Sequence, residues 1–218
     1  MAKEKELNAV DMTAEIENKS TEDGEYTIKL KTPYAFEDKK YSEIDMSGLK
    51  DLTIGDAIKA QGDLFGQQEV ACSMLCETTT AFARELAAKA TSLPVEFFKF
   101  MPRGIAKNVV AAVRAHLRVE DNPDNHVLRF KQPYLFKGTQ YEEINLSGIA
   151  NLTCMNESEA ENRLAREGFV ITENSFNYLY ACIIASMATG QPEEFFTGLP
   201  LSELLSLKNA VNDDSFFE

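Results

Sequence analysis

The sequence predicts an α+β fold, predominantly helical, in which two similar modules each place a small β-hairpin before about four helices. Three observations support this prediction. A stretch of 21 residues that begins at Pro33 is written a second time from Pro133, an alternating apolar and polar segment precedes the first copy, and apolar residues at helical spacing follow both copies. The chain is therefore predicted to contain one structural unit twice.

The repeat pairs PYAFEDKKYSEIDMSGLKDLT with PYLFKGTQYEEINLSGIANLT. Ten of these 21 positions are identical under a shift of 100 residues, which is far beyond coincidence. The similarity resumes at a shift of 98, where SLPVEFFKFMP corresponds to GQPEEFFTGLP, so the second copy has lost two residues in between. We interpret the chain as a tandem duplication with two domains of about 90 to 100 residues, each large enough to bury a core.

A β-hairpin is predicted at the start of each module. Residues 26–31 alternate between apolar and polar side chains, which indicates a half-buried strand, and Pro33 is expected to end it. A second strand is predicted over residues 41–46, with a polar turn at residues 37–40. The second copy has its turn at residues 137–139, where a glycine favours a tight turn.

Helical segments follow each hairpin. Thr53 and Asp56 have the spacing of a helix N-cap with an acidic residue in the first turn. Pro94 and Pro192 stand where a helix can start, because proline at the first helical position gives up only an unpaired donor. The predicted helices are 53 to about 62, 67–90, a short helix from 94, and 104–118 in the first copy, then 156–167, 173–188, a short helix from 192, and 201–211 in the second.

The chain divides into five parts on composition. The boundary between the modules is a short cluster of turn residues, so the two modules are expected to touch. The C-terminal segment is acidic and ends with two aromatic residues, Phe216 and Phe217, which are expected to be exposed. The parts are a flexible acidic arm (1–25), the first module (26–121), a linker (122–125), the second module (126–211) and an acidic tail (212–218).

Repeated phenylalanines are the candidate partner-binding residues. Phe97 and Phe98 recur as Phe195 and Phe196 in the short helix of each copy. These rings could pack inside each module, or they could be displayed as anchors for a partner helix, and the sequence leaves both interpretations open.

The charge of the chain is strongly negative and unevenly spread. The net charge of −13 argues against nucleic acid as a partner, because phosphate binding depends on Lys and Arg. Residues 26–119 contain 13 basic and 11 acidic residues, whereas residues 120–218 contain 6 and 16. Lys107, Arg114 and Arg118 share one face of a predicted helix, and this basic face could bind the acidic module of a neighbouring chain, head to tail, or that of its own chain.

Motifs for catalysis or cofactor binding are missing from the sequence. It contains no phosphate-binding loop, dinucleotide fingerprint, nucleophile elbow or HExxH motif, so we predict no catalytic residue and no cofactor. His116 and His126 are expected to be surface residues, and the four cysteines to be buried or half-buried thiols, so no metal site is predicted. No apolar run is long enough to cross a bilayer and no signal peptide is recognised, so we expect no membrane partner and a cytoplasmic location.

Both modules resemble the small tail assembly chaperones of long-tailed bacteriophages. The resemblance rests on KTPYAFEDKKYSEIDMS with ATSLPVEFFKFMP, and on KQPYLFKGTQYEEINLS with ATGQPEEFFTGLPLSELLSL, and it covers residues 26–211. Two features depart from the family pattern. The module is duplicated, and residues 101–104 read Met-Pro-Arg-Gly where the second copy has Leu-Pro-Leu-Ser.

This resemblance implies a non-enzymatic chaperone that coats the tape measure protein while tail tube subunits assemble around it. The tail tube protein is then a further candidate partner, the location is the host cell cytoplasm, and the chain is expected to be absent from the mature virion. Two fused modules would supply linked weak contacts along such a client. The alternatives are a structural virion component, such as a tail or head–tail connector subunit, and a phage-encoded adaptor protein.

Overall fold

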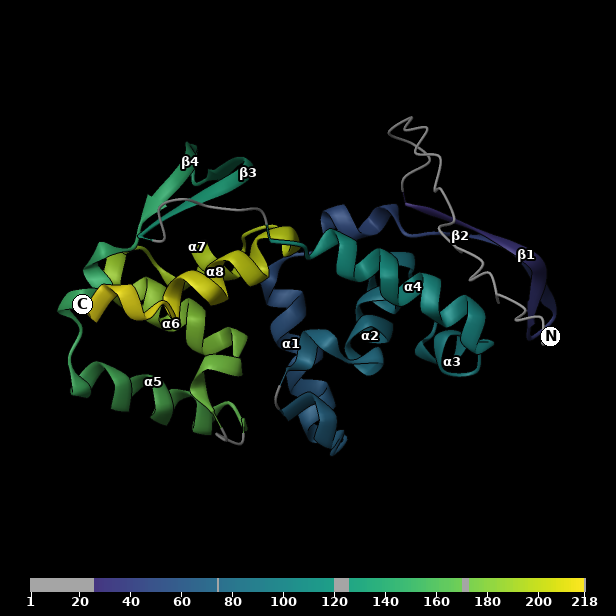
Figure 1. The fold of residues 1–218 in the computed structure, drawn as a ribbon, viewed down its shortest axis with the longest axis horizontal. Helices are drawn as coiled ribbons and strands as arrows, with labels where there is room; N and C mark the ends of the chain where they lie inside the picture. Colours follow the sequence, from purple (N-terminus) through teal and green to yellow (C-terminus); the bar gives the residue numbers. More distant parts are fainter. Residues whose placement is uncertain (1–25, 74, 120–125, 170–172, 218) are drawn as a thin grey trace, which may run out of the picture.

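The computed structural model describes residues 26–73, 75–119, 126–169 and 173–217. The predicted N-terminal arm and the predicted linker lie outside these residues. Figure 1 shows an elongated molecule with the first module on the right, the second on the left and helix α1 (Ile54–Gly66) between them. Each module carries a hairpin at the upper side of this view and its helices below, so the fold is α+β and predominantly helical, as predicted.

Each hairpin is a separate antiparallel sheet of two strands. Strand β1 (Thr27–Phe36) pairs with β2 (Lys39–Asp45), and β3 (Val127–Phe136) pairs with β4 (Thr139–Asn145). The predicted turns are confirmed, and Lys137 and Gly138 there have φ angles of 48° and 84°. Glycine is suited to this left-handed backbone conformation because it has no Cβ.

The prediction that Pro33 ends the first strand is wrong. Lys29 pairs with Glu43 and Tyr34 with Tyr41, so residues 30–33 of β1 lie opposite the single residue Ser42. A proline at such an irregularity loses no ladder hydrogen bond, and the strand therefore continues through it. The second hairpin has the same shift between Arg129 and Tyr134.

The predicted helix start at Thr53 is confirmed. The Thr53 side chain accepts a hydrogen bond from the Asp56 backbone N–H at 3.3 Å, and Asp56 Oδ2 accepts one from the Thr53 backbone N–H at 3.1 Å. Helix α1 runs to Gly66, four residues beyond the predicted end at Gly62. Helix α5 (Cys154–Arg166) starts in the same way, at a capping box formed by Thr153 and Asn156.

The long helix predicted over residues 67–90 is wrong. Gln68 has a φ of 59°, and two short 3₁₀ turns, η2 (Val70–Ser73) and η3 (Cys76–Thr78), follow it. Helix α2 (Thr80–Thr91) begins only after the N-cap residue Thr79, whose hydroxyl accepts a hydrogen bond from the Phe82 N–H. In the second module α6 (Tyr178–Thr189) likewise begins later than predicted, capped by Asn177.

The remaining elements correspond between the modules. Pro94 and Pro192 are the N-cap residues of their short helices, one position before the predicted place. In the first module these elements are η1 (Ser47–Asp51), α3 (Val95–Lys99) and α4 (Arg103–His116). In the second module they are η4 (Ser147–Asn151), η5 (Asn174–Phe176), α7 (Glu193–Thr197), η6 (Leu201–Glu203) and α8 (Leu204–Val211), followed by η7 (Asp214–Phe217).

The two repeated sequence segments meet in the core of each module. In the first module the Phe97 ring of α3 is surrounded by three hairpin rings, with centroid distances of 5.0 Å to Tyr34, 5.3 Å to Phe36 and 4.8 Å to Tyr41. Phe195 is surrounded in the same way in the second module, by Tyr134, Phe136 and Tyr141. Edge-to-face pairs of this kind add about 0.5–1.5 kcal/mol each to the burial of the rings.

A glycine at one position of the repeat allows a close backbone approach. A Cβ at Gly48 would lie 2.1 Å from the Ala90 carbonyl oxygen, and one at Gly148 would lie 2.0 Å from that of Ala188. The 3₁₀ turn after each hairpin therefore packs directly on the last turn of a helix, η1 on α2 in the first module and η4 on α6 in the second. This contact explains why Ser-Gly recurs in both copies.

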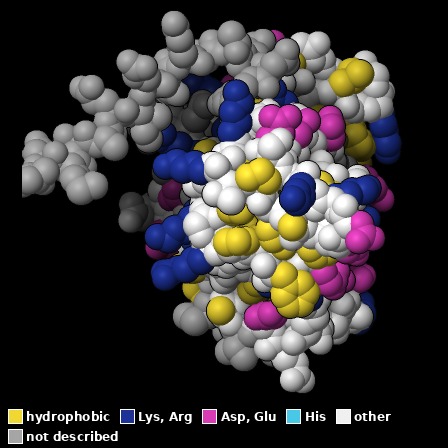
Figure 2. All heavy atoms as spheres, turned by 90° about the vertical axis from the view of Figure 1, so that its right-hand side faces the viewer, with side chains coloured by type: hydrophobic (Ala, Val, Ile, Leu, Met, Phe, Trp, Pro, Cys, Tyr) yellow, Lys and Arg dark blue, Asp and Glu magenta, His cyan; other side chains and the backbone are white. Residues whose placement is uncertain are grey.

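The outer end of the first module exposes apolar side chains. Figure 2 shows this end face-on, with hydrophobic side chains gathered near its middle and charged side chains around them. Phe100, just after α3, is 73% exposed. The expectation for the C-terminal aromatics is wrong for Phe216, which is 7% exposed and stacks on His126, while Phe217 is 70% exposed.

Candidate functional site

A main-chain bridge joins the two modules. The Ile54 N–H donates to the Leu199 carbonyl at 2.9 Å, and the Leu201 N–H donates to the Leu52 carbonyl at 2.8 Å. Ile54 is the first residue of α1 and Leu201 the first residue of η6, positions whose N–H has no partner inside its own helix. Each module therefore supplies a carbonyl oxygen that accepts a hydrogen bond from a backbone N–H of the other module.

Helix α1 packs between α2 of its own module and the second module. Ile54 and Ala57 are completely buried, and Gln61 is 1% exposed. The Gln61 amide donates to the Phe176 carbonyl at 2.9 Å and accepts from the Tyr178 N–H at 3.1 Å. A buried amide with both functions satisfied stabilises one relative position of the two modules.

A buried ion pair connects the modules at a third place. Lys208 of α8 forms a salt bridge with Glu77 of η3, and their side chains are 9% and 10% exposed. The Tyr178 hydroxyl donates to the second oxygen of Glu77 at 2.9 Å. Burial raises the pKa of Tyr178, and the neighbouring Cys76 and Glu77 raise it further, so its hydroxyl stays a donor.

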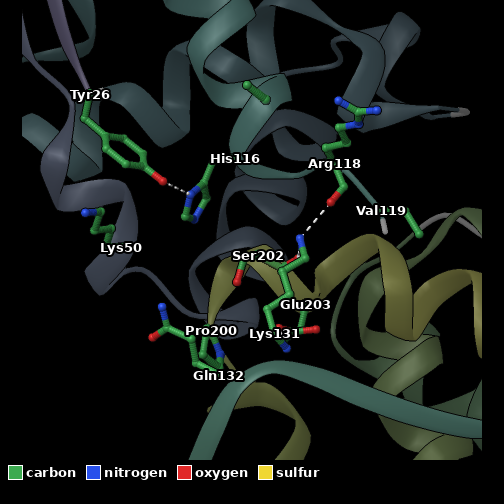
Figure 3. A pocket seen from close by; sticks show the side chains of 11 residues that line it. Tyr26, Lys50, His116, Arg118, Val119, Lys131, Gln132, Pro200, Ser202 and Glu203 are labelled. Atoms are coloured by element: carbon green, nitrogen blue, oxygen red, sulfur yellow. Dashed lines mark hydrogen bonds between the residues drawn. The ribbon is translucent and has the colours of Figure 1, made fainter. Parts of the chain in front are cut away.

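A pocket of about 590 Å³ lies between the modules. Figure 3 shows Tyr26, Lys50 and His116 of the first module opposite Gln132, Pro200 and Ser202 of the second. At one edge the Lys131 ammonium donates to the carbonyls of Arg118 and Ser202, at 2.7 and 2.9 Å. We call this space the inter-module pocket.

The predicted surface position of His116 is wrong. The ring is half-buried and forms a hydrogen bond of 3.1 Å between its Nδ1 and the Tyr26 hydroxyl. Burial, together with the charges of Lys131 and Lys50, lowers the pKa of His116 to about 4. The imidazole is therefore neutral at physiological pH, and its Nδ1 interacts with a tyrosine that helps line the inter-module pocket.

A second space of about 560 Å³ lies on the outer end of the first module, between β1 and the start of α4. Leu30, Pro33 and Ile105 supply apolar lining, and Lys29 and Lys31 also line it. We call it the outer groove. Its residues 31, 32, 102, 104 and 105 correspond in the repeat to residues 131, 132, 200, 202 and 203, which line the inter-module pocket. The outer groove is therefore the face of the first module that corresponds to the face of the second module lining the inter-module pocket.

The four candidate phenylalanines are buried. Phe97, Phe195 and Phe196 are 0% exposed and Phe98 is 6% exposed, each within the core of its module. Of the two interpretations that the sequence left open, the structure favours packing inside the modules, because a ring without solvent access cannot contact a partner. These side chains are therefore removed from the candidate contact surface.

The three candidate basic residues are all exposed, Lys107 and Arg114 on α4 and Arg118 two residues after its end. Arg114 donates from its guanidinium to the Thr78 carbonyl of the first module. Arg118 lines the inter-module pocket, and its carbonyl accepts the hydrogen bond from Lys131 of the second module. Lys107 lies near the other end of the helix, toward the outer end of the molecule. The structure brings only Arg118 to the module boundary.

The cysteines are mostly buried, as predicted, except for Cys154. Cys72, Cys76 and Cys182 are buried free thiols, and burial raises the pKa of Cys76 and Cys182. Cys154 is exposed at the start of α5. Among the described residues no three His, Cys, Asp or Glu side chains gather as a metal site.

The described part of the chain contains no helix that combines the length and the apolar character of a membrane span. The described residues form two similar modules joined by a main-chain bridge, with a pocket between them and a groove on the outer end of the first module. Comparisons with protein-family models, curated proteins and solved structures found no match to this chain.

Proposed function

We propose that this chain is a non-enzymatic phage tail assembly chaperone, which binds the tape measure protein in the host cytoplasm and keeps it soluble while the tail tube is built. The observation that carries the proposal is the outer groove. An open groove with apolar walls and lysines beside it can take the apolar face of a helix that also carries acidic residues. A tape measure chain is mostly helical and exposes such faces before the tube encloses it.

The exposed Phe100 extends the apolar surface of this end of the molecule beyond the groove. A side chain that is 73% exposed contributes little to the fold and is free to contact a client. A shallow contact of this kind is weak, which suits a chaperone that the tail tube protein must displace. Several linked contacts along one client would supply the required affinity.

The motifs that carry the sequence resemblance lie in the elements that form the core of each module. The Pro-Tyr and Tyr-x-Glu-Ile segments supply the hairpin, and the Pro-x-Glu-Phe-Phe segment supplies the short helix whose ring packs against the hairpin. These motifs therefore determine the fold of the module. The departure at residues 101–104 lies at the outer groove, which is consistent with a contact surface that differs between members.

The proposal is tested by co-expressing the tape measure protein with this chain. We expect the tape measure protein to be soluble with the wild-type chain and to precipitate without it. Phe100→Asp should lower the soluble fraction, whereas Phe217→Asp should leave it unchanged, because both rings are similarly exposed but Phe217 lies outside the groove region. Equal effects of the two substitutions would contradict the assignment of the surface.

A second measurement separates a chaperone from a structural component. Mass spectrometry of purified virions should lack peptides of this chain, since an assembly chaperone leaves before maturation. Stoichiometric amounts in the particle would refute the proposal in favour of a tail or head–tail connector subunit. Recovery of a regulatory protein in place of the tape measure protein would instead indicate an adaptor.

A further inference from the structure

Each module also contains a copy of the segment that the other module uses in the bridge, and this copy is not part of the bridge. In the first module the bridge is made by residues 52–54 at the start of α1, and the copy of this segment is residues 152–154 at the start of α5. In the second module the bridge is made by residues 199–201, and the copy is residues 101–103 at the start of α4. We call residues 152–161 the free helix face and residues 99–103 the free loop face.

Exposure shows that these copies are uncovered. Ile54 is 0% exposed, whereas the corresponding Cys154 is exposed and the next residue, Met155, is 77% exposed. Leu201 is 0% exposed, whereas the corresponding Arg103 is exposed. The same residues of the fold are therefore covered by a neighbour in one module and open in the other.

The backbone of both free faces already has the conformation of the bridge. Thr53 has φ and ψ of −111° and 168°, and Thr153 has −117° and 165°. Pro200 has −52° and 144°, and Pro102 has −55° and 140°. Cys154 and Arg103 are first helical residues, so their N–H groups have no partner inside their own helices. The backbone at these two positions therefore already has the conformation that the bridge requires.

The side chains of the free faces are complementary in charge. Ala57 and Gln61 of the covered face correspond to Glu157 and Glu161 of the free helix face. On the other side, Thr197 and Leu201 correspond to Lys99 and Arg103 of the free loop face, both exposed. The uncharged residues of the contact inside the chain are thus replaced by acidic residues on one free face and basic residues on the other. Glu157 and Glu161 are half-buried and accept hydrogen bonds from Tyr180 and Asn174 of their own module, whereas Lys99 and Arg103 are exposed. Attraction between the two pairs of charges is weakened by salt.

We propose that the free helix face of one chain binds the free loop face of a second copy, through the same main-chain bridge that joins the modules within a chain. The contact is heterologous, so it continues as an open head-to-tail assembly or closes into a ring. The outer groove would then become a pocket between the two chains, because the corresponding space inside the chain is the inter-module pocket. This inference requires no client and is independent of the proposed function.

The contact between chains should be weaker than the contact inside the chain. A Cβ at Gly55 would lie 3.2 Å from the Thr197 carbonyl oxygen, and the corresponding residue of the free helix face is Met155. The second bridge must therefore stand a few tenths of an ångström wider. The free faces also lack counterparts of Glu77 and Lys208, because the corresponding residues are Ser175 and Val110.

Proline substitutions test the bridge. Cys154→Pro and Arg103→Pro each remove one donor N–H, and proline is tolerated at the first position of a helix. Sedimentation velocity of the full chain, with reductant to prevent disulfides through Cys154, should show concentration-dependent association at low salt that high salt reverses. Both proline variants should be monomeric, and the matched control Cys154→Ala, which keeps the N–H, should associate like the wild type.

Mixing the two proline variants tests the head-to-tail geometry. Each variant keeps one intact free face, and the two intact faces are the complementary pair. An equimolar mixture should therefore form a one-to-one dimer and nothing larger. A wild-type chain that stays monomeric at high concentration, proline variants that assemble normally, or a mixture that remains monomeric would each overturn the proposal.

If circular dichroism shows that a proline variant is unfolded, an exchange of charges provides a second test. The double variants Glu157→Lys, Glu161→Lys and Lys99→Glu, Arg103→Glu should each abolish association. Combining all four substitutions should restore it, because both faces then have reversed charge and are again opposite in sign. Glu142→Lys and Lys39→Glu are the matched controls, since both residues are exposed on the hairpins outside the free faces. Loss of association in the controls, or no recovery in the quadruple variant, would contradict the contact.

Discussion

The buried salt bridge between the modules gives a sharp test of their interface. Lys208→Met removes the ammonium and leaves the Glu77 carboxylate, whose side chain is 10% exposed, with the Tyr178 hydroxyl as its remaining hydrogen-bond donor in this cluster. Breaking a buried pair in this way costs about 3–5 kcal/mol, because a charge stays buried without compensation. We therefore expect Lys208→Met to lower the free energy of unfolding by about 3 kcal/mol.

Urea unfolding followed by circular dichroism measures this loss. The double variant Glu77→Gln, Lys208→Met should recover about half of it, since a neutral amide still accepts from Tyr178 and no charge is buried. Arg129→Met is the matched control, because its salt bridge with Glu143 joins side chains that are both 57% exposed and should contribute less than about 1 kcal/mol. A loss below about 1 kcal/mol for Lys208→Met would show that the pair is hydrated and that the interface is looser than described.

Three further predictions concern the fold and its pH dependence. Gly148→Ala should lower the free energy of unfolding by about 3 kcal/mol, because its Cβ would lie 2.0 Å from a carbonyl oxygen. Gly104→Ala is the control in the same urea titration and should be neutral or stabilising, because no atom lies within 4 Å of its Cβ. Phe195→Ala should cost about 3–5 kcal/mol and broaden the near-ultraviolet signals of the tyrosines around the ring. In the unfolded chain His116 binds a proton below pH 6.5, whereas in the folded chain its pKa is about 4. The free energy of unfolding should therefore fall by about 2 kcal/mol as the pH is lowered from 6.5 to 4. His116→Gln should remove that part of the slope, and an unchanged slope would contradict the half-buried neutral ring.

The hairpins and the capped helices could be predicted because their signals are local. Strand alternation, the turn glycine and the Thr53–Asp56 spacing each act within a few residues, and both copies repeat the pattern. Pro33 misled the prediction because a strand can pass through proline where its partner strand leaves residues unpaired. The late start of α2 was missed because the apolar spacing upstream also fits 3₁₀ turns, and only the Thr79 cap marks the true beginning.

The module interface could not be predicted from either copy alone. Leu-Thr occurs at residues 52–53 and again at 152–153, yet within one chain only the first pair contacts a neighbour. The informative signal is the difference between the copies. Gln61 stands at a position of helical spacing that should be apolar, and it is buried because its amide bonds to the backbone of the other module. Comparing the polarity of corresponding residues in the two copies would have identified the covered face.

The uneven charge of the chain has a physical explanation in this asymmetry. The covered faces meet within one chain at a high effective concentration, so they can be apolar without ever being exposed to solvent. The free faces are exposed in every unassembled copy, and an apolar surface there would promote aggregation. In the proposed contact, Glu157 and Glu161 on one face, and Lys99 and Arg103 on the other, would allow only one order of contact. Duplication of a module followed by this divergence would convert one interface into a permanent contact and a reversible one.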